Sequence, residues 1–176
     1  MKTLRHNTYE TNSSSTHSIT IVNRKNYNGS VVGTAPIITD NVLLPENLQK
    51  SEAYTEIETG EGGYVLKCAS TYQKAALTVH YLNSLYEYAK YDSDVMSDED
   101  YDAFRNYALK HLCERLGLDR IESPQNCNDY YHSSEDGSCP LIEVVDSKYP
   151  TEEFNKYVSD IILNEEIIII DQDIPY

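Results

Sequence analysis

The sequence predicts an α+β fold, in which one mixed β-sheet carries about three main helices on one side. β-Branched runs of strand length lie near both ends of the chain, at residues 18–23 and 167–170. Between these two runs, apolar residues recur at helical intervals in three segments. At 176 residues, of which 40% are hydrophobic, the chain suits a single domain (1–176) with a sizeable core.

The first strand is expected at 18–23, directly after a polar stretch. Because side chains alternate across a strand, His17, Ile19 and Ile21 share one face, which places His17 at the edge of the core. A turn follows around residues 26–29. Further strands are expected at 31–32, 37–38, 53–58 and 64–68, with a turn into a short helix at 43–48.

The first main helix is expected from Ser70, because Ser70 and Gln73 have the spacing of a capping box, and it continues to about residue 90. Ser97, followed by three acidic residues, opens the second helix, which Gly117 ends. Thr151 is expected to cap the third. Residues 141–145 read as a strand, 167–170 as a buried strand, and 119–140 as a long loop without apolar periodicity.

The net charge of −15 disfavours nucleic acid as the main partner. The charge is uneven, since residues 1–35 hold four basic residues against Glu10 alone. A small anionic ligand therefore finds its most favourable local potential near the N-terminal stretch. A basic protein partner is better matched to the remaining, acidic surface.

The four cysteines are widely spaced and include no Cys-x-x-Cys pair, so the sequence predicts reduced thiols and no metal site. The chain shows neither a signal peptide nor an apolar run of membrane-spanning length. These features predict a cytoplasmic protein without a membrane partner. They identify no cofactor and no oligomeric state.

The best candidate site is the Ser-rich segment at residues 8–18. Its hydroxyl and amide groups can hydrogen-bond a phosphate or a carboxylate, and its imidazole can transfer protons. The predicted ligand-binding residues are Asn12, Ser13, Ser14, Ser15 and Thr16. His17 is the predicted catalytic residue. In the alternative interpretation, the hydroxyls satisfy the segment's own backbone and the segment is purely structural.

A second cluster, residues 132–136, lies in the long loop and supplies His132, two serines and two carboxylates. If this loop folds over the Ser-rich segment, His132 becomes a second catalytic residue for acid–base chemistry. The alternative is a solvated acidic loop. The acidic stretch 92–102 is read most simply as a solvated helix entry, and otherwise as a mimic of nucleic-acid phosphates.

From Arg5 through the Glu-Thr-Asn-Ser-Ser-Ser-Thr-His-Ser run at 10–18, the chain resembles an uncharacterised group of bacterial and bacteriophage proteins. Weaker resemblance continues at 70–75, where that group starts a helix, and at 131–134, where Tyr131 stands in place of an Asp. The resemblance implies a mobile-element or phage context in a bacterial host cell. It brings no known activity.

Three functions are compatible with these features, and they leave open whether the protein is an enzyme. The leading one is a phage- or prophage-type accessory protein that binds, or acts on, a small nucleotide-like anion at the Ser-rich segment. The alternative is a non-enzymatic acidic inhibitor or binder of a host protein, of the anti-defence type. The third is a structural phage component.

Overall fold

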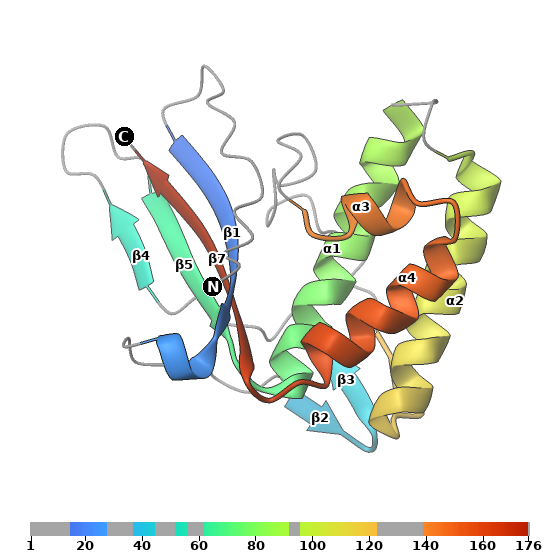
Figure 1. The fold of residues 1–176 in the computed structure, drawn as a ribbon, viewed down its shortest axis with the longest axis horizontal. Helices are drawn as coiled ribbons and strands as arrows, with labels where there is room; N and C mark the ends of the chain where they lie inside the picture. Colours follow the sequence, from blue (N-terminus) through green and yellow to red (C-terminus); the bar gives the residue numbers. More distant parts are fainter. Residues whose placement is uncertain are drawn as a thin grey trace.

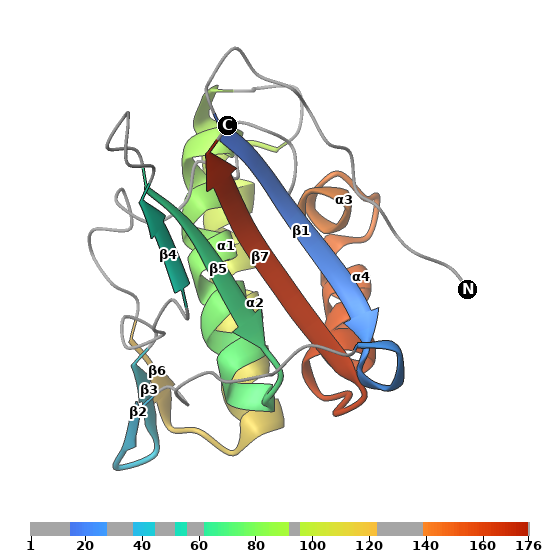
Figure 2. The ribbon, with the colours of Figure 1, turned by 90° about the vertical axis from the view of Figure 1, so that its left-hand side faces the viewer.

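The computed structural model has the predicted α+β architecture, with a four-stranded sheet covered by helices on one face (Figure 1). Turning the molecule shows the strands in front and the helices behind them (Figure 2). The structure describes residues 15–27, 37–44, 52–55, 62–91, 96–122 and 139–175. The strand expected at 31–32 lies outside these residues, as does the long loop from 123 to 138.

The main sheet has the order β1-β7-β5-β4 and is antiparallel throughout. β7 (Ile167–Pro175) pairs over its full length with β1 (Ser15–Asn23). On its other side, residues 169–173 of β7 pair with β5 (Gly62–Cys68). β4 (Glu52–Thr55) pairs with β5. Both terminal strands are longer than predicted: β1 begins three residues earlier, and β7 continues five residues further.

A small second sheet contains β2 (Ile37–Thr39), β3 (Val42–Leu44) and β6 (Arg120–Ile121). Asp40 and Asn41 join β2 to β3 with positive φ angles of 51° and 60°, which is the backbone of a tight two-residue hairpin. The prediction of a turn into a helix was wrong at residues 43 and 44, because the hairpin makes them strand. β6 pairs in parallel with β3 inside the segment predicted as a loop.

α1 (Thr71–Tyr91) is the central helix and begins with the predicted capping box. The Ser70 Oγ accepts a hydrogen bond from the Gln73 amide at 3.2 Å, and the Gln73 Oε1 accepts one from the Ser70 amide at 3.0 Å. Every residue from 73 to 82 is buried, so the helix is enclosed on all sides. It lies between the main sheet and α2 (Figure 1).

α2 (Asp98–Leu116) has both predicted ends. The Ser97 Oγ accepts from the Asp100 amide, and Gly117 takes the left-handed conformation at φ 66°, where an L side chain is disfavoured. The Tyr101 hydroxyl donates to the Leu82 carbonyl, and the Arg105 guanidinium donates twice to the Asn83 side chain. These contacts fix α2 against α1.

The C-terminal helices correct two predictions. Residues 142–145 form α3 (Ile142–Val145) and not a strand, because Leu141, Val144 and Val145 bury side chains at helical spacing. α4 (Pro150–Tyr157) begins with its proline at the first turn, so Thr151 is not the cap. A π-helical segment, η4 (Val158–Ile162), continues α4. Together the two segments bury Phe154, Tyr157, Val158 and Ile162.

Lys74 of α1 is fully buried and holds the connection between η4 and β7. Its ammonium donates to the carbonyls of Ile161 at 2.8 Å, Asn164 at 2.6 Å and Ile167 at 3.1 Å. Burial is the largest cause that lowers the pKa of Lys74, to about 8, with the nearby Arg24 next. The amine is therefore protonated at neutral pH and can use all three of its donors.

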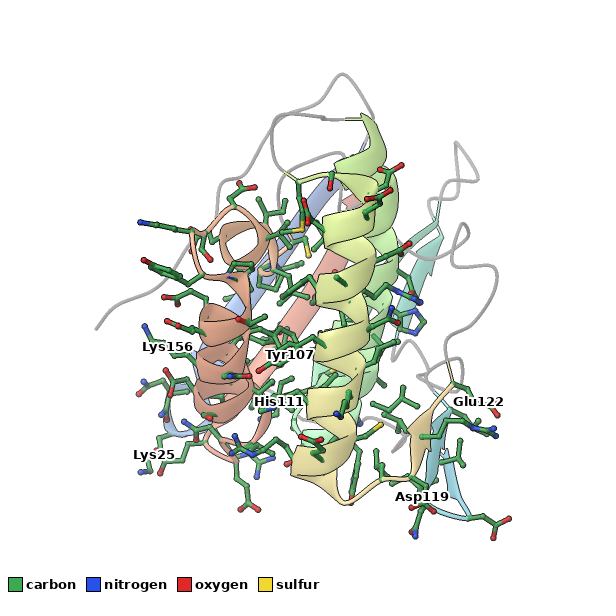
Figure 3. All side chains as sticks on the ribbon, turned by 90° about the vertical axis from the view of Figure 1, so that its right-hand side faces the viewer. Lys25, Tyr107, His111, Asp119, Glu122 and Lys156 are labelled. Carbon is green, nitrogen blue, oxygen red and sulfur yellow. The ribbon has the colours of Figure 1, made fainter. Side chains whose placement is uncertain are left out.

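His111 of α2 lies in the contact between α2 and α4. Its ring stacks on Tyr107 at a centroid distance of 5.8 Å and meets the Phe154 ring edge-on at 6.4 Å (Figure 3). The Tyr107 hydroxyl donates to the Asn155 side chain of α4 at 2.7 Å. Within the described part of the chain, His111 Nε2 is the one buried side-chain polar atom without a hydrogen-bond partner. Burial, with a contribution from Arg115, lowers the pKa of His111.

Replacing Lys74 by Met should lower the free energy of unfolding by about 2–4 kcal/mol, because three buried carbonyls lose a charged donor. Urea unfolding at pH 7 measures this loss. Lys110→Met is the control: Lys110 is exposed and lies 3.9 Å from Glu114, so its loss should stay below about 0.5 kcal/mol. Equal stability of the two variants would contradict the structural role of Lys74.

Acidification should destabilise the protein through His111. Its folded-state pKa lies below the unfolded value, so the unfolded chain binds more protons and stability falls as the pH drops through about 6.5. Replacing His111 by Phe removes this titration and keeps an aromatic ring in the contact. The test is urea unfolding at several pH values between 5 and 8, where the difference in stability between the two proteins should change with pH. A constant difference would show that His111 does not contribute.

Candidate functional site

A buried carboxylate lies on the central strand of the main sheet. Asp171 of β7 and Tyr81 of α1 are both fully buried, and the Tyr81 hydroxyl donates to Asp171 Oδ2 at 3.1 Å. Moving a carboxylate out of water costs several kcal/mol unless hydrogen bonds compensate for it. Among the residues whose burial is described, Asp171 is the one buried carboxylate, and the candidate site lies beside it on β7.

The charge of Asp171 acts on two buried thiols, those of Cys68 and Cys139, and both are unreactive. Burial, followed by the charge of Asp171, raises the pKa of the Cys68 thiol far above its usual value. Burial is also the main cause that raises the pKa of Cys139, to about 12. Only a thiolate is a good nucleophile or metal ligand, so both cysteines act as small core residues at neutral pH.

Two residues further along β7, at Asp173, the strand register brings together three residues of polar type. Asp173 is the partner of His17 on β1 and of Tyr64 on β5. Directly opposed residues of antiparallel strands lie on the same face of a sheet. Because Asp173 is two residues from Asp171, this row shares its face with the buried carboxylate, about 7 Å further along the strand. The start of β1 and the end of β7 lie at the same end of the sheet (Figure 2).

The register also locates the predicted site residues that the structure describes. Ser15, Thr16 and His17 belong to β1, opposite Pro175, Ile174 and Asp173, so they are strand residues and not part of a loop. Ser15 and His17 share the face of Ile19, which is 5% exposed, whereas Thr16 falls on the other face. Asn12, Ser13, Ser14 and His132 lie outside the described residues. The meeting of the His132 loop with the Ser-rich segment stays a prediction.

The fold changes the electrostatics expected at the start of β1. Counted along the sequence, the N-terminal stretch is basic, but β7 sets Asp171 and Asp173 beside Ile19 and His17. A carboxylate repels an anion and accepts hydrogen bonds from hydroxyl, amino and imidazole groups. The row at Asp173 therefore suits a group that donates hydrogen bonds better than it suits an anion.

Sequence reasoning missed Asp171, Asp173, Tyr64 and Tyr81. The sequence did contain a signal for the two acids. Ile169, Asp171 and Asp173 are every second residue, so they share one face of a strand that continues past residue 170. Ending the strand at the last Ile concealed this alternation. Tyr81 lies seven residues after Lys74 on α1, on the polar stripe completed by Thr78, whereas the prediction followed the apolar stripe.

Two other predictions concern the described surface. At the acidic entry of α2, Asp98, Glu99, Asp100 and Asp102 are exposed, and the Ser97 hydroxyl donates to Asp100 Oδ2 at 2.6 Å, as in a solvated helix start. Among the described residues, no group of three His, Cys, Asp or Glu side chains can hold a metal ion. No helix in the same part of the chain has the length and apolar character needed to cross a membrane.

Replacing Tyr81 by Phe should cost about 1.5–3 kcal/mol of unfolding free energy, because it removes one donor from a buried carboxylate. Tyr107→Phe is the matched control, since the Tyr107 hydroxyl meets a neutral, half-buried Asn155 and its loss should cost about 1 kcal/mol. Combining Tyr81→Phe with Asp171→Asn in a double-mutant cycle should give a coupling of at least about 0.5 kcal/mol. Additive losses would show that the two groups do not interact.

Comparisons of the chain with protein-family models, with curated proteins and with solved structures gave no match.

Proposed function

We propose that this protein binds a small nucleotide-like anion at the end of the main sheet where the Ser-rich segment enters β1. In this proposal it works as an accessory protein of a phage or prophage, the context implied by the sequence resemblance. One observation carries the choice of site: the register sets His17 opposite Asp173, one row from the buried Tyr81–Asp171 hydrogen bond.

The two ends of the site favour a ligand with two chemically different ends. Hydroxyl and backbone amide groups of Asn12, Ser13, Ser14 and Ser15 provide donors for a phosphate. Asp173 provides an acceptor at the other end, where a sugar hydroxyl or a base amino group can donate to it. A nucleotide carries both kinds of group, whereas inorganic phosphate carries only the first.

In the same proposal, His17 transfers protons near neutral pH, and His132 is the second candidate for that role. By the register, His17 is a residue of the same β1 face as Ile19 and Ile21. A residue at this edge of the core can be both anchored by its strand and accessible from the end of the sheet.

The test is thermal unfolding with AMP, ATP or inorganic phosphate as probes. A bound nucleotide at 100 times its Kd adds about 2.7 kcal/mol, which corresponds to a rise of a few degrees in Tm. Ser13→Ala with Ser14→Ala, and separately His17→Ala, should remove this rise. Reversing the charges of Asp98 and Glu99 on α2 should leave it intact. No rise with either nucleotide, or a rise that survives the serine changes, would contradict the proposal.

A second candidate function, binding a basic host protein, is favoured by the outer surface of the C-terminal helices. Between residues 139 and 166, all the acidic residues are exposed and only two residues are basic. The acids are Glu143, Asp146, Glu152, Glu153, Asp160, Glu165 and Glu166. A surface of one sign steers a partner of the opposite sign and suppresses others. If charge reversals here remove biological activity while the Ser13 and Ser14 changes do not, this second function is the better one.

A further inference from the structure

We propose that the outer edge of β1, which faces away from β7, binds an extended basic segment of another protein. The segment adds to the four-stranded main sheet as a further antiparallel strand. This inference deepens the second candidate function and rests on it for the origin of the partner in the host. It names the strand that receives the partner and the conformation that the partner adopts. It does not depend on the nucleotide site.

The first support is the composition of β1, which is an edge strand. Among the strands that the structure describes, β7 and β5 each have two neighbours, whereas β1 pairs with β7 alone. The opposite edge strand, β4, is four residues long, and β1 is nine residues long. β1 contains no Pro and no Lys, Arg, Asp or Glu, and its register with β7 runs without a bulge. Natural edge strands use these features, or a short length, to prevent pairing, so β1 is suited to accept another strand.

The second support is the direction of the backbone groups of β1. The amide of Arg24, the residue after β1, donates to the Glu166 carbonyl at 2.6 Å, and this pair continues the register of β1 with β7. In antiparallel strands, such hydrogen-bonded pairs alternate with pairs whose amides and carbonyls point away from each other. Counting back from Arg24, the groups that point to the outer edge belong to every second residue, namely Asn23, Ile21, Ile19, His17 and Ser15.

The third support is the charge of the helices beside this edge. α3 and α4 lie behind the sheet on the side of β1, whereas α1 and α2 lie behind β5 and β4 (Figure 2). Glu152 and Glu153 of α4 and Asp160 of η4 are exposed. Every second side chain of an added strand would lie on the face of the sheet that these helices cover. Lys or Arg at those positions would meet a surface of opposite charge, so the edge and its surroundings select a basic strand.

The same charge argues against a second copy of this chain as the partner. Two β1 strands that pair antiparallel about a twofold axis would place the helices of both copies on the same face of one continuous sheet. The acidic C-terminal helices of the two copies would then approach each other, in a protein with a net charge of −15. Because like charges repel, the outer edge of β1 favours a basic segment of a different protein.

The experiment measures fluorescence anisotropy of a labelled peptide of alternating Lys and Thr, equal in length to β1, with the full chain and without nucleotide. In an antiparallel addition, the peptide residues that bond Ile19 and Ile21 lie directly opposite them and share their face, which the helices cover. These should be the Lys residues. N-methylation of the Lys amides should therefore weaken binding about tenfold or more, and N-methylation of the Thr amides by less than about threefold. The same peptide with Glu in place of Lys should not bind.

Two variants of the protein test the two halves of the inference separately. Ile21→Pro removes an amide that points to the outer edge and none that bonds β7, so it should weaken the Lys–Thr peptide about tenfold, whereas Ile21→Val should not. Glu152→Lys with Glu153→Lys should also weaken binding about tenfold. The matched control is Asp98→Lys with Glu99→Lys on α2, which changes the net charge equally and should cost less than about threefold.

Equal binding of the two N-methylated peptides overturns the inference, and so does unchanged binding by folded Ile21→Pro. If Ile21→Pro does not fold, the two N-methylated peptides still decide with the native protein. A native dimer in sedimentation that Ile21→Pro converts to a monomer would also overturn it, because a second copy would then occupy the edge. If only the charge reversal on α4 weakens the peptide, the second candidate function stands without the edge site. If the edge binds the peptide but charge reversals leave biological activity intact, that function fails and the edge site stands.

Discussion

The three hydrogen bonds of the Lys74 ammonium are the constraint on which the rest of the structure depends. They join α1 to the end of η4, to the turn at Asn164 and to the first residue of β7. A cation at the carbonyl end of a helical segment also stabilises its dipole. Since β7 is the strand that β1 and β5 both pair with, fixing its start against the central helix positions the whole sheet against the helical layer.

The contacts of Lys74 extend into a buried polar stripe along α1. The Thr78 hydroxyl donates to the Lys74 carbonyl at 2.8 Å and lies 3.4 Å from the Tyr157 hydroxyl, and Tyr81 reaches Asp171 one turn later. Apolar contacts alone can slide, whereas the contacts that Lys74, Thr78 and Tyr81 make outside α1 exist in only one alignment of this helix with α4, η4 and β7. Breaking any of them leaves a buried polar group unsatisfied, so the stripe selects a single packing arrangement.

Local signals in the sequence were sufficient for the start of α1 and for both ends of α2, and they were insufficient for α3 and for the candidate site. The Ser70–Gln73 box, the Ser97 cap and the Gly117 terminus are complete within a few residues, so their chemistry can be read without the fold. Residues 142–145 were misread because β-branched composition outweighed the helical spacing of three buried residues. The row of His17, Asp173 and Tyr64 depends on register between segments more than a hundred residues apart, which no local pattern encodes.

The register of β1 with β7 also changes the charge expected around the start of β1. Charge counted along the sequence makes the N-terminal stretch attractive to an anion, but pairing places two carboxylates of β7 beside it. Because like charges repel, the end of β7 is less favourable to an anion than the charge counted along the sequence suggests. A nucleotide bound as we propose would therefore present a hydroxyl or amino group, and not its phosphate, to the end of β7.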